Sequence, residues 1–218
     1  WHTMTAVVDE GQILRQRLVD VSETDTAFSL NMKTYEAGIE SFPVLVADIE
    51  NNSLQPQIQN LAEKTYFGKY QRPSAAATLH WTQPAAEIAA LVRALDFGAY
   101  ENPLALPKLH LGETVYYVTE ISVLGNGAAA VPGQIIALSA NSLTVATATQ
   151  PVQLTHLRSL DGAAVDVQTL GLSVGSILPV LSAEQQEQLT AVTGQTARQE
   201  GFWVKRLAQL SGVEIPYA

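Results

Sequence analysis

The sequence predicts an α/β segment, followed by a small β-barrel and then a helical tail. Three observations predict this order. Apolar runs and helical spacing alternate in the first half of the chain, short β-rich runs separated by turn residues follow, and helical spacing returns near the end. Several short strands at close spacing are typical of a closed or partly closed barrel.

Two apolar runs, Thr3–Val8 and Ile13–Val21, begin the chain, and the letters Asp-Glu-Gly-Gln separate them. This spacing predicts two strands joined by a turn. Two helices are expected next. The first is capped by Asp25 or its neighbour Thr24 and ends at Gly38, because glycine is favoured just past a helix end. The second has Pro43 near its start, where the missing N–H costs nothing.

Residues 51–73 are polar and predict a surface connection between two units. Thr82 precedes Gln-Pro-Ala-Ala-Glu and predicts the cap of a helix that runs on to Leu95. Four β-rich runs follow, and Gly125-Asn126-Gly127 is a hairpin turn signal, because no phosphate-loop pattern surrounds it. The predicted strands are Thr114–Val123, Gly133–Ser139, Ser142–Thr147 and Val152–Leu160.

Ser182 to Leu210 predicts helix, with Phe202 and Trp203 near its end. These two aromatic residues either dock on a neighbouring module or pack against the chain's own helices. The sequence leaves both alternatives open.

Composition limits the class of function. The formal charge is −9, the acids are scattered, and no stripe of Lys and Arg is visible, so binding to nucleic acid is not expected. No apolar run reaches the roughly 18–20 residues that span a bilayer, so no membrane contact is expected. The chain has no cysteine, and we expect a cytoplasmic protein. Trp1 is no initiator residue, which suggests that sequence is missing upstream.

The first fourteen residues, from Trp1 to Leu14, resemble a segment of the methionyl-tRNA formyltransferase family in which a strand feeds a loop ending Asp-x-Gly-x-Ile-Leu. The resemblance implies that Asp9 is the family's catalytic aspartate. It also implies that Thr5, Ala6, Val7 and Val8 line the pterin pocket of 10-formyltetrahydrofolate. His2 is a possible further residue of this pocket.

The match continues in the family's order to about residue 181. It includes Tyr-Gln-Arg-Pro at 70–73, Leu-His-Trp at 79–81 and Pro-Gly-Gln-Ile at 132–135. The segments 93–98 and 102–104 most resemble the formyltransferase domain at the start of nonribosomal peptide synthetases. The tail from Gly201 to Tyr217 resembles the lead-in to a following synthetase module.

The resemblance implies four parts. Residues 1–70 are the remnant of a Rossmann-like catalytic domain, and 71–107 are a linker with the helix that opens the second domain. Residues 108–181 are an OB-like β-barrel, and 182–218 are a helical tail that leads to a following module.

The implied activity is transfer of a formyl group from 10-formyltetrahydrofolate to the amino group of an aminoacyl substrate on a peptidyl carrier protein. The downstream synthetase module is the other expected partner. Charge favours this acceptor over tRNA, because two basic residues and four acids lie between Leu106 and Leu181. Two alternatives stay open: a methionyl-tRNA formyltransferase, and a catalytically inactive docking module.

The family's chemistry also implies an Asn-x-His motif, and this sequence contains none. We therefore expect the chain by itself to be inactive. Asp9 can alternatively be a turn residue that bonds its own backbone, and His2 a structural residue. His80, His110 and His156 lie far apart without metal-ligand spacing, so no metal site is expected.

Overall fold

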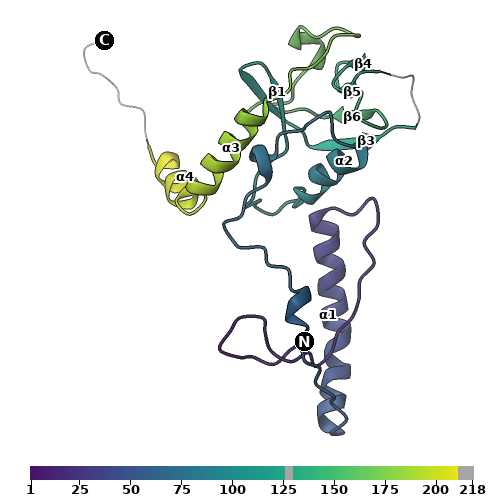
Figure 1. The fold of residues 1–218 in the computed structure, drawn as a ribbon, viewed down its shortest axis with the longest axis vertical. Coiled ribbons are helices and arrows are strands. Elements are labelled where there is room, and N and C mark those ends of the chain that lie inside the picture. Colours follow the sequence, from purple (N-terminus) through teal and green to yellow (C-terminus); the bar gives the residue numbers. More distant parts are fainter. Residues whose placement is uncertain (126–129, 211–218) are drawn as a thin grey trace. The chain divides into compact units, whose positions relative to one another are not determined.

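The computed structural model describes residues 1–125 and 130–210 (Figure 1). The chain divides into two compact units. The first comprises Trp1–Phe67 with Asp96–Glu101, and the second comprises Gly68–Leu95 and the residues from Asn102 on. No helix in the described ranges has the length and apolar character needed to cross a membrane.

One long helix, α1 (Ala27–Glu50), dominates the first unit. Thr26 caps it: its hydroxyl accepts from the Ser29 amide, and the Ser29 hydroxyl accepts from the Thr26 amide. Asp25 sits just outside the helix and accepts from the Ser22 amide, the Ser29 hydroxyl and the Lys33 ammonium. The cap therefore lies one residue beyond Asp25.

The prediction of two helices broken at Gly38 was wrong, because α1 runs through both Gly38 and Pro43. Ala37, Ser41 and Leu45 are buried at helical spacing on either side of these two residues. This packed face holds the helix together where local propensity favours a break.

The two predicted strands at the start of the chain were also wrong. His2 and Ile13 form an isolated antiparallel bridge, and Ile13 forms another with Gln57. The described residues of this region form no ladder that is longer than one such pair. A strand needs a neighbour for each backbone N–H and C=O group. In the described chain only the first residues of the run find such neighbours.

The second unit begins with a helical turn, Ser74–Ala77, in which Ala75, Ala76 and Ala77 have positive φ angles of 48°, 55° and 64°. Helix α2 (Ala85–Ala94) follows. Its predicted cap was wrong: Thr82 bonds His80, and the Ala85 amide donates instead to the Thr149 hydroxyl at 3.0 Å.

Two antiparallel sheets form the β part of this unit. Strands β1 (Lys108–Leu111) and β2 (Thr114–Tyr117) make a hairpin. The larger sheet has the strand order β3-β6-β5-β4. Its strands are β3 (Glu120–Val123), β4 (Ile135–Leu138), β5 (Ser142–Val145) and β6 (Val152–Thr155).

The run Thr114–Val123, predicted as one strand, divides between the two sheets. Tyr117 pairs on one side with Lys108 and exchanges backbone hydrogen bonds with Arg158 on the other, and the chain then changes sheet before Glu120. The predicted turn at residues 125–127 lies largely outside the described residues. Helices and antiparallel sheets agree with the predicted α/β plus β class, while the OB-like barrel and the Rossmann-like remnant stay predictions.

The core of the second unit lies between α2 and the sheets. Its centre is formed by fully buried side chains, among them Trp81, Ile88, Leu109, Leu143 and Leu154. Helices α3 (Ala183–Thr196) and α4 (Glu200–Ala208) follow, as predicted for the tail. The Thr190 hydroxyl of α3 accepts from the Ala75 amide and so ties this helix to the alanine turn.

Candidate active site

The Asp-x-Gly segment lies at the end of a closed loop. Thr3 and Gln12 close it, because the Thr3 amide donates to the Gln12 carbonyl and the Gln12 amide donates to the Thr3 hydroxyl, both at 2.9 Å. The Leu14 amide adds a bond to the Trp1 carbonyl. Residues 4–11 therefore form a loop whose two ends are fixed side by side.

Gly11 is buried at this closure. A β-carbon at this position would lie 1.6 Å from the Thr3 carbonyl oxygen, far inside contact distance. Only glycine lets the two backbones approach so closely. The glycine of Asp-x-Gly thus sets the path of the loop and the position of Asp9.

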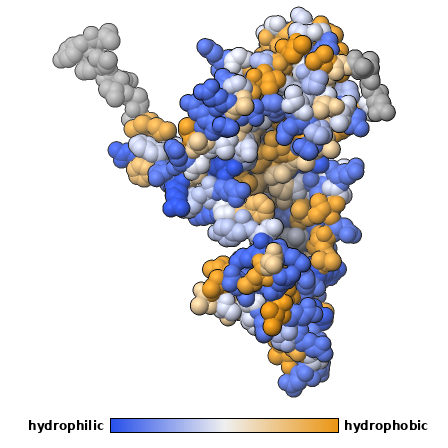
Figure 2. Space-filling model, viewed as in Figure 1, coloured by the Kyte–Doolittle hydropathy of each residue, from blue (hydrophilic) through white to orange (hydrophobic). Residues whose placement is uncertain are grey.

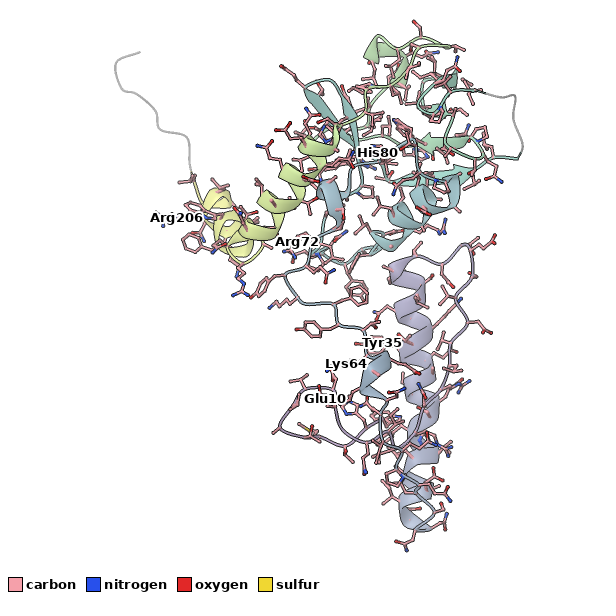
Figure 3. All side chains as sticks on the ribbon, in the orientation of Figure 1. Glu10, Tyr35, Lys64, Arg72, His80 and Arg206 are labelled. Atoms are coloured by element: carbon pink, nitrogen blue, oxygen red, sulfur yellow. The ribbon has the colours of Figure 1, made fainter. Side chains whose placement is uncertain are left out.

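Two side chains from residues far along the chain hold the loop. The side-chain Nε2 of Gln59 donates to the backbone carbonyl oxygens of Asp9 at 2.9 Å and Gly11 at 2.6 Å. Lys64 forms an ion pair with Glu10 at 2.7 Å, and both residues are labelled in Figure 3. The backbone on each side of Glu10 is therefore anchored, while the Asp9 carboxylate is left to face outward.

Asp9 and His2 come together. The His2 Nε2 atom lies 3.7 Å from Asp9 Oδ1, and the side chains are 42% and 78% exposed. Asp9 has a φ of 59°, in the left-handed region that Asp tolerates better than most residues. Because both side chains are exposed, an ion pair between them would contribute little free energy. The geometry nevertheless places the Asp9 carboxylate next to the His2 imidazole.

Thr5, Ala6, Val7 and Val8 lie on the outer part of the loop and are exposed. The Thr5 hydroxyl donates to the Val7 carbonyl at 2.8 Å. The amide groups of Ala6, Val7 and Val8 donate no hydrogen bond within the described residues. The segment thus presents unpaired backbone donors at the surface of the loop.

A cavity of about 490 Å³ begins at His2 and Asp9 and extends along Arg15, Thr34 and Gln59. Its wall is fixed by ion pairs, among them Arg15 with Asp48 at 2.7 Å. Thr5–Val8 do not line it. The cavity therefore joins the predicted catalytic and pocket residues and leaves out the predicted folate-binding segment.

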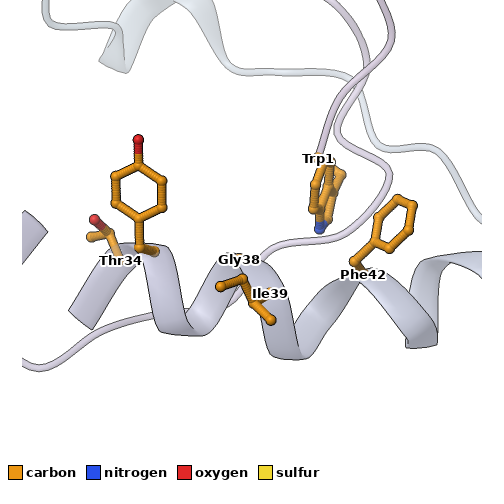
Figure 4. A pocket seen from close by; sticks show the side chains of 6 residues that line it. Trp1, Thr34, Gly38, Ile39 and Phe42 are labelled. Carbon is orange, nitrogen blue, oxygen red and sulfur yellow. The ribbon is translucent and has the colours of Figure 1, made fainter. Parts of the chain in front are cut away.

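An apolar hollow of about 630 Å³ lies beside it on α1, lined by Trp1, Tyr35, Ile39 and Phe42 among others (Figure 4). The Trp1 indole donates to the Ser41 hydroxyl at 2.8 Å and its ring lies 5.2 Å from that of Phe42. Apolar side chains reach the surface among hydrophilic ones in the space-filling view (Figure 2).

The remaining histidines do not gather. His80 bonds Thr82 at 2.8 Å, and His156 lies 3.8 Å from Glu120. Burial, aided by the charge of Lys108, lowers the pKa of His110. Within the described ranges, no three His, Cys, Asp or Glu side chains are placed to hold a metal ion.

Sequence reasoning missed Gln59 and Lys64. Both lie in the polar stretch 51–73, which predicted only a surface connection, and their partners are about fifty residues away. No local pattern marks a contact of that separation. The pairing of Ile13 with Gln57 is the feature that returns this stretch to the loop.

Comparison with known proteins finds a matching domain and several similar proteins. Residues 73–173 match the formyl transferase C-terminal domain. Methionyl-tRNA formyltransferase of Pseudomonas putida F1 is 32% identical over 168 residues, covering 77% of this chain and 51% of the relative. The Caulobacter vibrioides methionyl-tRNA formyltransferase is 39% identical over 93 residues, covering 43% of this chain and 30% of that one.

The fold is similar to that of WlaRD, a sugar 3N-formyl transferase whose crystal structure was determined in the presence of dTDP and 5-N-formyl-THF. The TM-score is 0.54 at 16% identity, over 74% of this chain and 54% of that one. The first relative and WlaRD each match most of this chain. The chain, however, spans only about half the length of each of these two proteins. Residues 73–173 are therefore similar to the formyl transferase C-terminal domain, and the rest of the match runs along formyltransferases of greater length.

Proposed function

We propose that the chain is part of a formyltransferase that moves a formyl group from 10-formyltetrahydrofolate to a substrate amine. The observation that carries this proposal is the match of residues 73–173 to the formyl transferase C-terminal domain. The likeness to whole formyltransferases extends beyond this segment, over 77% of the chain. We assign residues 1–70 to the catalytic domain, 71–107 to the linker, 108–181 to an OB-like barrel and 182–218 to the tail. We also place the protein in the cytoplasm.

In this reaction the amine nitrogen bonds to the formyl carbon and the bond from that carbon to N10 of the folate breaks. A negative oxygen develops on the formyl group on the way, the amine loses a proton, and N10 gains one as it leaves. Asp9 is the acid–base partner that the chain supplies. A carboxylate beside an imidazole can orient the ring, and the His2 imidazole lies 3.7 Å from the Asp9 carboxylate here.

The proposed folate site uses the loop before Asp9. The exposed amides of Ala6, Val7 and Val8 have no partner in the described chain, and the folate ring carries acceptors that such amides can bind. The residues present therefore fit the group. Folate, when bound, would supply the formyl carbon, and the amides of Ala6, Val7 and Val8 would help to position its ring.

For the acceptor we propose an aminoacyl group on a carrier protein. The matched segment 73–173 holds seven acidic and three basic residues. Lys108 donates to the Ala76 and Leu106 carbonyls, and Arg158 to the Gly162 carbonyl. Three basic residues among seven acids form no continuous stripe for a phosphate backbone. The segment after Leu181 is proposed to lead to a synthetase module.

Initiator tRNA is the second candidate acceptor, because the matched relatives are methionyl-tRNA formyltransferases. A third reading is an inactive docking module, which the absence of an Asn-x-His motif from the sequence before Asp9 in the gene would favour. In either enzyme reading we expect these 218 residues alone to give no turnover.

Two experiments test the proposal. Formyl transfer is assayed with the full polypeptide that the gene encodes, using 10-formyltetrahydrofolate and each acceptor in turn. Turnover should fall by about 100-fold or more in Asp9→Asn and persist in the control Glu23→Gln, which removes an exposed acid outside the loop. Equal rates in the two variants, or no turnover with either acceptor, would contradict it.

The second experiment uses the chain of 218 residues. It is titrated with an aminoacylated carrier protein and with Met-tRNA at low and at physiological salt. Binding to the carrier protein supports the first acceptor, and salt-sensitive binding to the tRNA supports the second. Turnover by this chain alone would refute the expected inactivity.

A further inference from the structure

The second unit has a cleft of its own, lined by residues that are remote in sequence from Asp9. Its volume is about 600 Å³, a size that suits a small-molecule ligand. The start of β1 and the loop before it line one side, and α3 and α4 line the other. The lining residues used below are Arg72, Lys108, Glu200, Trp203, Val204 and Leu207.

Arg72 is the buried cation of this cleft, with its side chain only 9% exposed (labelled in Figure 3). One terminal nitrogen donates to Glu200 at 2.8 Å, and the other reaches the carbonyls of Lys69 and Gln71. Its Nε is buried and has no partner in the described structure. The Glu200 carboxylate therefore balances the charge of Arg72 but leaves one donor unused.

Lys108 is the second cation. Its ammonium donates to the Ala76 carbonyl at 2.7 Å and the Leu106 carbonyl at 2.9 Å. It belongs to none of the ion pairs in the described part of the chain. Burial lowers its pKa, and the charge of Glu200 acts weakly in the opposite direction. An ammonium has three donors, so one remains.

The cleft thus carries two positive charges and one negative charge in a chain whose net charge is −9. A partly buried charge without a counter-charge is costly, and an anion removes that cost. Carbonyl partners orient the ammonium without neutralising it. The electrostatics of the cleft therefore select an anionic ligand.

The opposite wall is apolar. Trp203, Val204 and Leu207 of α4 line the cleft, and each remains more than half exposed. Large apolar side chains that face a cavity gain free energy when a ligand covers them. A ligand that satisfies both walls has a charged head and an apolar body.

We propose that this cleft binds an amphipathic anion, with an oxyanion head on Lys108 and an apolar body against Trp203 and Leu207. The site is independent of the formyl-transfer chemistry assigned to Asp9. Both a carboxylate and a phosphate monoester have the required head, and the probes below distinguish them.

Isothermal titration uses four probes with one ten-carbon chain and different heads: decanoate, decyl phosphate, decanol and decyltrimethylammonium, each below its micelle-forming concentration. At least one anionic probe should bind about tenfold or more tighter than decanol, because only the anions meet Lys108. The cationic probe should bind more weakly than decanol. Equal affinity for all four heads, or no binding at all, would overturn the proposal.

Three variants locate the site. Lys108→Met should bring the anionic probes to the affinity of decanol, whereas Lys205→Met, which removes a cation of α4 outside the cleft, should leave them unchanged. Glu200→Gln should tighten anion binding, a gain that misfolding cannot produce. Unchanged binding in Lys108→Met, or weaker binding in Glu200→Gln, would show that the charges of this cleft do not select the ligand.

Discussion

The carbonyl oxygen of Thr3 lies 1.6 Å from the point where a β-carbon would stand on Gly11. The loop that carries Asp9 therefore closes only around a residue without a side chain. This relationship, together with the bonds from Gln59, turns an exposed loop into a defined support for one carboxylate.

Gly11→Ala is expected to force Thr3 and residue 11 apart and to lower the free energy of unfolding of the first unit by about 1–3 kcal/mol. Urea unfolding measures this change. Gly38→Ala is the matched control, since a β-carbon there meets nothing within 4 Å. The control should gain roughly 0.5–1 kcal/mol, because alanine is the better helix former. Equal effects of the two substitutions would contradict this account of the loop.

Gln59→Ala removes both side-chain bonds to the loop backbone. Each such bond contributes about 1 kcal/mol net, so we expect faster amide hydrogen exchange at Thr3 and Gln12, whose amides close the loop, and little change in the second unit. Gln55→Ala alters a side chain that makes no hydrogen bond in the described structure, and its exchange pattern should match the parent protein. Protection of the loop that survives Gln59→Ala would show that other contacts close it.

The pH dependence of the first unit should reflect Asp25. The Lys33 ammonium, followed by the Ser22 amide and the Ser29 hydroxyl, holds the pKa of Asp25 well below its ordinary value of 3.8. A carboxyl with a lowered pKa in the folded state stabilises above its unfolded pKa, and that contribution is lost as the pH falls toward the folded pKa. The Tm should therefore drop from about pH 4 downward.

Asp25→Asn should lower the Tm at neutral pH and flatten this acid limb. Glu23→Gln, which removes an exposed acid two residues away, is the control and should keep the limb. An acid limb of equal size in both variants would place its origin elsewhere.

Thr149→Ala tests the cap of α2. The Ala85 amide donates to the Thr149 hydroxyl, and loss of a capping hydroxyl costs about 1 kcal/mol. Thr82→Ala, at the position that the sequence pattern favours, should cost clearly less, since that hydroxyl bonds only His80. Thermal unfolding of both variants measures the difference, and the reverse order would restore Thr82 as the cap.

The contrast between Thr82 and Thr149 illustrates which features local sequence patterns can predict and which they cannot. Patterns of nearby residues predicted α2 and the strands at β5 and β6 well, because apolar spacing and turn residues act locally. They failed where a distant residue decides the outcome. Thr149 caps α2 from a loop beyond β5, and the face around Ala37 and Leu45 carries α1 through Gly38 and Pro43.

The candidate site shows the same limit. Resemblance located Asp9 and the loop before it, and the glycine two residues on is explained by the close approach of Thr3. The supports Gln59 and Lys64 could not be foreseen, because a glutamine and a lysine in a polar stretch have no signature that points to a partner fifty residues away. Catalytic and folate-binding roles for this loop remain proposals.

The alanine turn at Ala75–Ala77 has a consequence for chirality. Three successive L-residues there follow the mirror image of the usual helical path. Alanine is the smallest residue with a chiral α-carbon. A D-alanine at position 76 should fit this turn better than the natural residue, and any β-branched L-residue should fit worse. The range of residues that this corner accepts is therefore set by handedness before it is set by size or polarity.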